Sequence, residues 1–238
     1  MRQVFRKLRK PRFLLVYPLV GLLFATARIT EPALRAGALV VLLGELIRLW
    51  ANGYVGHQKV NRTGKRKDEP KIGQLITNGP YAYIRHPLYL GSLLIGTGFC
   101  IIGGRLWVAV VALVVLLSVY RRKMMEEELT LLHEYGNAFE QYRDTVPRYL
   151  PTWRRYAHPS GSWSWNGIVA SKEFKTVAWL AVTLIALYFW EEYLEGQGLF
   201  APGHRLKHVS FLVVAVALMA GDITFEVARK LRRRPLPT

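Results

Sequence analysis

Two short strings of the sequence carry residue types that ionic or acid–base chemistry needs. The first string, residues 76–91 (ITNGPYAYIRHPLYLG), includes the polar aromatic and basic residues Tyr81, Arg85, His86 and Tyr89. The second, residues 123–129 (KMMEEEL), holds Lys123, Glu127 and Glu128. Lys123 and Glu127 are four residues apart and share one face of a helix. His86 and Glu128 are candidates for accepting a proton.

The elements that must position these strings are long apolar runs. Hydrophobic residues make up 51% of the chain and the mean hydropathy is +0.14, yet the net charge is +17. Apolar runs in lipid, alternating with basic loops at anionic headgroups, give this combination. We therefore expect an all-α integral membrane protein with about six transmembrane helices. The apolar runs are residues 13–29, 33–50, 87–104, 106–120, 176–194 and 209–225.

The basic residues predict the orientation of these spans. With six spans and the N-terminus inside, 28 of the 33 Lys and Arg residues fall on the cytoplasmic side. Both termini and both polar strings then face the cytoplasm. A signal peptide is the alternative for the first run, but no small-x-small cleavage pattern follows it, so we expect an uncleaved anchor.

Other partners of a basic chain are less consistent with the sequence. Nucleic acid is not expected, because Lys and Arg punctuate the apolar runs instead of lining one face. The single cysteine, Cys100, allows no intrachain disulfide, and the six scattered histidines give no zinc-ligand spacing, so we expect no metal site. Glu45 and Arg48 lie three residues apart in the second run and are interpreted as an ion pair outside the site.

The two polar strings should meet because of a helical hairpin. The third and fourth runs are joined by Gly103-Gly104-Arg105, which predicts a tight turn at the far surface. The start of one helix then lies beside the end of the other, and the two strings face each other. Helix should continue through residues 121–133, stop near Gly136 and resume over Phe139 and Tyr142 before the prolines. Each polar residue alone has an ordinary explanation as a solvated anchor, so the hypothesis depends on both strings and their order.

In that order the motifs resemble the isoprenylcysteine carboxyl methyltransferase family and, more loosely, the membrane phospholipid methyltransferases. The resemblance rests on NGPYAYIRHPLYLG, followed about forty residues later by EEELTLLHEYGNAFEQYRDTVPRYLP, and covers about residues 72–151. It implies a methyltransferase domain over 1–151, followed at 152–238 by an interfacial linker and two further spans. The family fold is a helical membrane bundle that binds S-adenosylmethionine without a Rossmann domain. Consistently, no Gly-x-Gly-x-x-Gly follows a strand pattern, and Gly96-Thr97-Gly98 is interpreted as helix packing.

The resemblance also implies roles for individual residues. The residues that it places at the cofactor are Gly73, Gln74, Leu75, Ile76, Tyr81, His86, Tyr89 and Glu127, the first four largely through their backbone. The residues that it places at the chemistry are His86, Lys123 and Glu128. Lys123 stands where the prenylcysteine enzymes carry a substrate-contacting arginine. Lysine lacks the bidentate fork that arginine offers a carboxylate, so the sequence does not determine the chemical class of the methyl acceptor.

Such a site suits methyl transfer to a lipophilic acceptor that enters from the bilayer. Aromatic faces stabilise a sulfonium by about 0.5–2 kcal/mol, and alignment with exclusion of water supplies most of the acceleration of an in-line displacement. A carboxylate acceptor needs no general base, whereas an amine or phenol would need His86 or Glu128 to take its proton.

Three functions compete on the sequence alone. The first is methyl transfer, either to a carboxylate or to a phospholipid amine. The second is a membrane reductase of the sterol type, and the third is a non-catalytic membrane scaffold that kept the fold. The sequence names neither the acceptor nor the oligomeric state.

Overall fold

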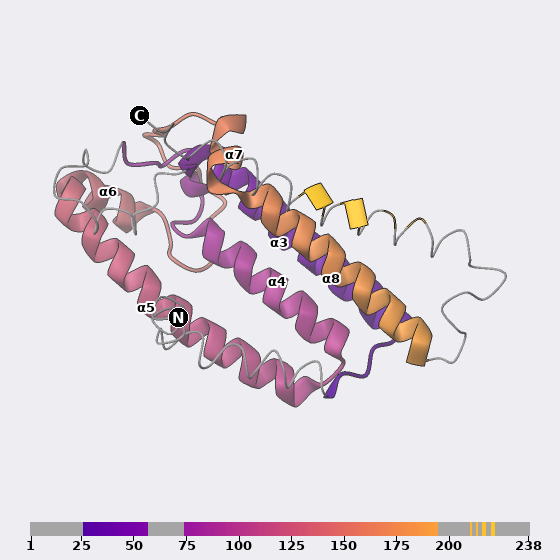
Figure 1. Cartoon of the computed structure of the whole chain (residues 1–238). Coiled ribbons are helices and arrows are strands. Elements are labelled where there is room, and N and C mark those ends of the chain that lie inside the picture. Colours follow the sequence, from indigo (N-terminus) through magenta and orange to yellow (C-terminus); the bar gives the residue numbers. More distant parts are fainter. Residues whose placement is uncertain are drawn as a thin grey trace, which may run out of the picture. The chain divides into compact units, whose positions relative to one another are not determined.

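The computed structural model describes residues 26–56 and 74–194, together with a few residues between 210 and 221. In this part of the chain every regular element is helical, which confirms the all-α prediction (Figure 1). The elements are α3 (Glu31–Val55), the 3-10 turn η2 (Gly79–Ala82), α4 (Pro87–Gly103), α5 (Leu106–Tyr135), α6 (Asn137–Thr145), α7 (Trp165–Ser171) and α8 (Glu173–Leu194). The chain forms two compact units, Met1–Glu173 and Phe174–Thr238.

Four of the six predicted apolar runs are helices in the structure, namely α3, α4, α5 and α8. The first run and most of the sixth lie outside the described residues. Among the described helices, α8 is long and apolar enough over Glu173–Glu192 to cross a membrane, whereas the apolar helix α4 has 17 residues and is shorter. Six transmembrane spans and their orientation therefore stay predictions.

Helices α3 and α4 approach each other closely at paired glycines. A Cβ atom on Gly98 would lie 2.6 Å from the backbone oxygen of Gly37, and one on Gly44 would lie 2.6 Å from that of Gly91. The glycines are seven residues apart on each helix, in opposite order, as an antiparallel contact requires. Small residues let helix backbones come together in this way, and the packing interpretation of Gly98 is confirmed.

The predicted hairpin between α4 and α5 is present. Gly104 adopts a left-handed φ of 64° and ends α4, its backbone N–H donating to the carbonyl oxygen of Ile101 over 3.0 Å. Beyond its apolar part α5 continues to Tyr135, and Gly136, with a φ of 51°, separates it from α6. The two polar strings thus lie at the same end of the hairpin.

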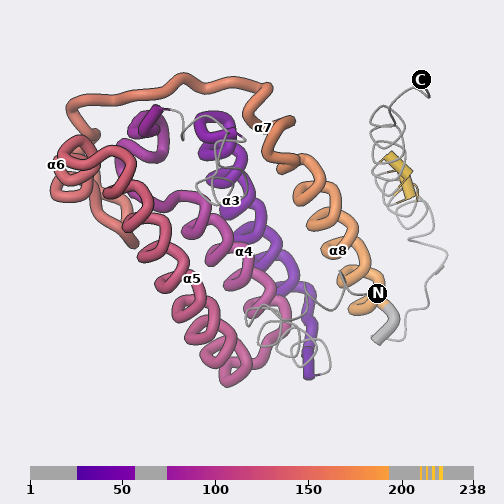
Figure 2. Tube along the Cα trace, turned by 60° about the vertical axis from the view of Figure 1, so that its left-hand side comes forward, coloured from indigo at the N-terminus to yellow at the C-terminus, as the bar shows by residue number. Residues whose placement is uncertain are grey.

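The segment after α6, residues 146–164, returns across this end of the α3–α4–α5 bundle (Figure 2). We call it the returning segment. It pairs with residues 77–85 through backbone hydrogen bonds, from Arg85 to Pro147, Thr152 to Tyr83, Tyr156 to Ala82 and Thr77 to Ser160. A buried cluster holds the pairing together, consisting of Ala82, Phe139, Tyr142, Val146 and Tyr156. Phe139 and Tyr142, two of the aromatic residues in the string EEELTLLHEYGNAFEQYRDTVPRYLP, are therefore core residues.

The glycine contact gives a matched pair of variants on α4. Gly98→Ala places a methyl group against backbone atoms of α3, which cannot move aside, so we expect a loss of about 1–3 kcal/mol of stability. Gly96→Ala is the control, because its methyl group meets only the end of the Leu116 side chain. Thermal unfolding in detergent, followed by circular dichroism, measures both, and equal unfolding temperatures would contradict the close contact.

Candidate active site

His86 and Glu128 meet in the interior although they are 42 residues apart in sequence. His86 precedes the first turn of α4, and Glu128 lies on the extension of α5 past its apolar part. The His86 Nε2 atom is 2.9 Å from Glu128 Oε1, and both side chains are more than nine-tenths buried. The hairpin thus brings the two sequence motifs into direct contact, as predicted.

Glu128 has two further cationic partners. Arg148, in the returning segment, contacts both carboxylate oxygens, with its Nε atom 3.0 Å from Oε1. Arg85 Nη1 lies 3.3 Å from the same Oε1. Burial alone would raise the pKa of Glu128, but hydrogen bonds with His86 and Arg148 and the charge of Arg85 lower this pKa to about 2. Glu128 is therefore ionised at neutral pH.

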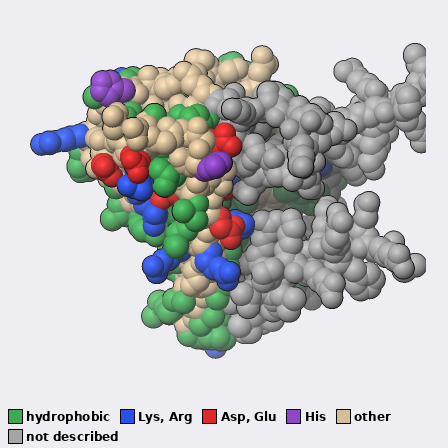
Figure 3. Space-filling model, turned by 90° about the vertical axis from the view of Figure 1, so that its left-hand side faces the viewer, with side chains coloured by type: hydrophobic (Ala, Val, Ile, Leu, Met, Phe, Trp, Pro, Cys, Tyr) green, Lys and Arg blue, Asp and Glu red, His purple; other side chains and the backbone are tan. Residues whose placement is uncertain are grey.

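Tyr89 and Glu127 form a second contact between the motifs. The Tyr89 hydroxyl donates to Glu127 Oε1 over 2.7 Å, and the ring of Tyr89 stands edge-on to that of His86, with centroids 5.7 Å apart. The other ring nitrogen of His86, Nδ1, is 4.0 Å from Glu127 Oε2. His86 therefore lies between two carboxylates. Acidic and basic side chains alternate on the surface of this end of the molecule, which carries α6 (Figure 3).

Tyr81 and Lys123 lie differently from the residues of this contact. Tyr81 is buried in η2, and its carbonyl oxygen accepts a hydrogen bond of 2.7 Å from the hydroxyl of Tyr142. Burial, followed by the charges of Tyr142 and Glu127, raises the pKa of the Tyr81 phenol well above its usual value. Lys123 pairs with Glu126 on the exposed side of α5.

The remaining predicted cofactor residues precede η2. Gln74 is exposed, Leu75 packs against the buried cluster, and the Ile76 side chain lies against Gly161 of the returning segment. Gly73 lies outside the described residues.

Arg148 is the site residue that the sequence analysis missed. It was visible only as part of the proline-flanked end of the second motif, Pro147-Arg148, and nothing in its spacing pointed to Glu128. Arg85, in contrast, was expected to face the acidic cluster and does so. Its Nε and Nη1 atoms are buried and make no hydrogen bond with any described residue.

The arrangement can hold a small ligand that carries both charges. Carboxylates at Glu127 and Glu128, donors at His86 and Arg85, and aromatic faces at Tyr81 and Tyr89 lie on neighbouring elements. Within residues 26–56 and 74–194 no group of three His, Cys, Asp or Glu side chains is placed to hold a metal ion.

Comparison with known proteins confirms the predicted resemblance. Residues 32–138 match the phospholipid methyltransferase family. The protein-S-isoprenylcysteine O-methyltransferase of Schizosaccharomyces pombe is 28% identical over 109 residues, 46% of this chain and 45% of that protein. The enzyme of the same name from Rattus norvegicus is 30% identical over 116 residues, 49% of this chain and 40% of that protein. The chain therefore spans less than half the length of these curated relatives.

A third relative carries a different name and matches more of the chain. The cobalt-zinc-cadmium resistance protein CzcN of Cupriavidus metallidurans is 27% identical over 165 residues, 67% of this chain and 69% of that protein. No solved structure matches the chain significantly. The matched family region, 32–138, contains His86, Tyr89, Glu127 and Glu128 but ends before Arg148.

Glu128→Gln tests the charge at the centre of the site. At neutral pH the variant loses charge-assisted hydrogen bonds, so its free energy of unfolding should be about 2–3 kcal/mol lower than that of the wild type. Because the pKa of Glu128 is lowered from 4.5 to about 2 on folding, this stabilisation is present above pH 4.5 and disappears as the pH falls toward 2. Denaturant unfolding of both proteins across this range should show the difference closing; a constant difference would contradict the assignment.

Proposed function

We propose that this chain is a membrane-embedded methyltransferase that uses S-adenosylmethionine and methylates a lipophilic acceptor. The observation that carries the proposal is the meeting of the two motifs through His86–Glu128 and Tyr89–Glu127. The relatives named as isoprenylcysteine O-methyltransferases and the phospholipid methyltransferase match support the same chemistry. S-adenosylmethionine, when bound, supplies an activated methyl group on a sulfonium.

The described residues fit the charges of this donor. Arg85 is ion-paired with Glu128 through Nη1, and its buried Nε has no hydrogen-bond partner among the described residues and suits a carboxylate. Glu127, with its carboxylate 18% exposed, suits an ammonium or a hydroxyl group. The rings of Tyr81 and Tyr89 supply aromatic faces for a sulfonium. The backbone of residues 73–76 stays the proposed lining on the remaining side.

Glu128 is assigned a positioning role within this proposal. A carboxylate with a pKa of about 2 that contacts two arginines and a histidine is a weak base. It instead orients His86 through the Nε2 contact, so that His86 is the better candidate where an acceptor must lose a proton. Lys123 would reach an acceptor carboxylate only after leaving Glu126.

The outer surface of the bundle supports embedding in a bilayer. Large apolar side chains on α3 are exposed along one stripe, consisting of Leu39, Leu42, Leu43, Leu46 and Trp50. A second stripe follows α5, consisting of Leu106, Trp107, Val110, Val111, Val114 and Leu117. Continuous apolar surface of this kind is unfavourable in water and suits lipid. We propose that both helices cross the membrane, with the polar site on the cytoplasmic side.

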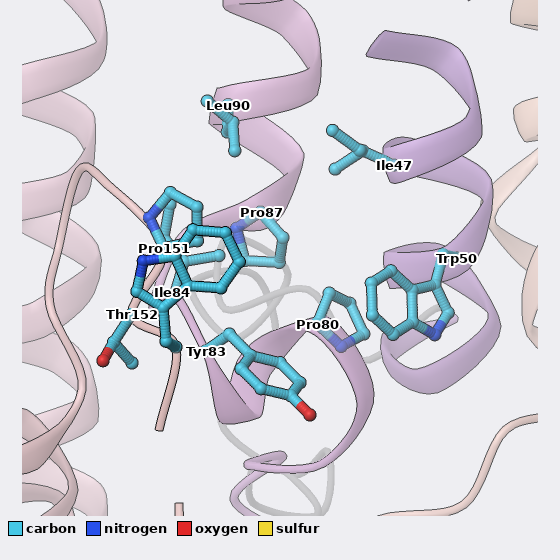
Figure 4. A pocket seen from close by; sticks show the side chains of 10 residues that line it. Ile47, Trp50, Pro80, Tyr83, Ile84, Pro87, Leu90, Pro151 and Thr152 are labelled. Atoms are coloured by element: carbon cyan, nitrogen blue, oxygen red, sulfur yellow. The ribbon is translucent and has the colours of Figure 1, made fainter. Parts of the chain in front are cut away.

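A cavity of about 340 Å³ lies beside the donor site and suits the apolar part of the acceptor (Figure 4). Its walls come from α3, η2, α4 and the returning segment, and the lining residues are Ile47, Trp50, Pro80, Tyr83, Ile84, Pro87, Leu90, Pro151, Thr152 and Trp153. No charged side chain lines it. Pro87 and Leu90 line the cavity, whereas His86 and Tyr89, the residues directly before them, contact Glu128 and Glu127. A hydrocarbon chain in the cavity would therefore keep its polar end within one helical turn of the donor site.

Two acceptor classes are compatible with this arrangement. A prenylcysteine-like carboxylate is the first, supported by the names of the relatives, and it needs no proton removal. A phospholipid amine is the second, supported by the name of the matched family, and it would need His86 as the base. Mass spectrometry of lipids and small prenylcysteines, incubated with methyl-labelled donor and membranes, separates an O-methyl ester from an N-methyl amine.

Donor binding tests the site directly. Glu127→Ala and His86→Ala should each weaken binding of S-adenosylmethionine by about tenfold or more, because each removes a charged or hydrogen-bonding contact worth about 1.5–3 kcal/mol. Glu126→Ala is the matched control, since Glu126 belongs to the same acidic cluster but faces Lys123 at the surface. Calorimetry on the detergent-solubilised chain measures all three, and unchanged affinity in both site variants would refute this location.

Filling the cavity tests the acceptor side separately. Ile47→Trp should raise the KM for a small prenylcysteine by about tenfold and leave the Kd of S-adenosylmethionine unchanged. Leu43→Trp is the control and should change neither constant. Leu43 lies one turn away from Ile47 on α3, and its side chain is 52% exposed. Equal acceptor kinetics for the two variants would exclude the cavity as the acceptor site.

A further inference from the structure

Arg48 on α3 is the centre of a buried ionic network outside the donor site. The predicted ion pair with Glu45 is present, with Arg48 Nε 3.6 Å from Glu45 Oε2. A shorter contact, which the sequence did not reveal, joins Arg48 Nε to Glu173 Oε1 over 2.6 Å. Glu173 is 2% exposed and is the first residue of α8, so this contact ties the start of α8 to α3.

The charges in this network hold the guanidinium firmly. Glu45 is 5% exposed, and neither of its carboxylate oxygens makes a hydrogen bond with a described residue. The buried carboxylate of Glu173 therefore depends on the Arg48 guanidinium for compensation, and removing an ionised group from water without a partner costs several kcal/mol. If Arg48 moved away, a buried carboxylate would lose its cationic partner. The side chain is therefore held in place, and its remaining N–H groups point in a fixed direction.

That direction leads to α4 and α5. Arg48 Nη1 donates to the hydroxyl of Ser92, which in turn donates to the carbonyl oxygen of Leu88 over 2.9 Å. The Ser92 side chain also interacts with the hydroxyl of Tyr120 on α5. Arg48 thus fixes Ser92, which adjoins the polar end of Tyr120.

The ring of Tyr120 completes the connection to the donor site. It packs against the ring of Tyr89, with centroids 5.2 Å apart and planes inclined by 58°. The hydroxyl of Tyr89 is the donor to Glu127 Oε1 over 2.7 Å. A side chain that must hold a hydrogen bond at a ligand site needs neighbours that fix its rotamer, and Tyr120 supplies such a neighbour.

We propose that Arg48 is a positioning residue that links Glu173, at the start of α8, to Glu127 in the donor site through Ser92, Tyr120 and Tyr89. The inference rests on the proposed function, since its readout is the affinity for S-adenosylmethionine. It gives Glu173, which lies beyond the family match at 32–138, a defined influence on donor binding.

The experiment is a double-mutant cycle between the two ends of the connection. Tyr120→Phe keeps the ring and removes the hydroxyl, and Glu173→Gln keeps the shape and removes the charge. Each should weaken binding of S-adenosylmethionine by about threefold to tenfold, the equivalent of one hydrogen bond. The affinity of the double variant for S-adenosylmethionine should be no lower than that of the lower-affinity single variant, because both substitutions break the same connection. Arg48→Lys should weaken binding likewise, since a point charge cannot bridge Glu173 and Ser92 as a guanidinium does.

Matched controls separate positioning from loss of structure. Glu31→Gln removes a carboxylate that pairs with Arg35 at the surface of the same helix, and it should leave the affinity unchanged alone or combined with Tyr120→Phe. The unfolding temperature of Tyr120→Phe should stay close to that of the wild type. Unchanged affinity in Tyr120→Phe, or effects of Tyr120→Phe and Glu173→Gln that multiply, would overturn the connection while leaving the proposed function intact. A wild-type chain that binds no S-adenosylmethionine would instead refute the proposed function itself.

Discussion

A buried carboxylate must be compensated by cationic partners, and the site is organised around that requirement at Glu128. The cationic partners are Arg85, directly before α4, and Arg148 in the returning segment, and the ring of His86 adds a hydrogen bond. Because all three converge on one pair of oxygens, the end of α5, the start of α4 and the returning segment cannot shift independently. Glu127 is the residue before Glu128, and Tyr89 lies one helical turn after His86. The contact between Tyr89 and Glu127 is therefore held by the same arrangement.

The helical bundle supplies the frame for this convergence. Paired glycines bring the backbones of α3 and α4 into contact, and the left-handed Gly104 reverses the chain between α4 and α5. The buried cluster around Phe139 and Tyr142 then holds η2 and the returning segment over the open end. As a result, the first turn of α4 faces the polar contact on one side and an apolar cavity on the other. The proposed reaction, between a charged donor and an apolar acceptor, would use both environments.

The family match at 32–138 covers most of the polar contact, and the similar proteins carry different names. Three names accompany this match, namely phospholipid methyltransferase, isoprenylcysteine O-methyltransferase and a metal resistance protein. This distribution is consistent with a common donor site and acceptor pockets that differ. Two walls of the cavity, α3 and α4, lie within the family match, whereas Pro151 to Trp153 come from the returning segment beyond it.

The sequence by itself determined the helices, the hairpin and the meeting of its two motifs. Apolar periodicity, glycine turns and helix caps act over a few residues, so α4, α5, the break at Gly136 and the contact of His86 with the acidic cluster could all be predicted. Only the tertiary structure decided which carboxylate each cation contacts. Arg148 pairs with Glu128 from 20 residues away, and Arg48 reaches Glu173 across 125 residues. Such partners are chosen by distance, burial and charge after the chain has folded, and no local pattern in the sequence records them.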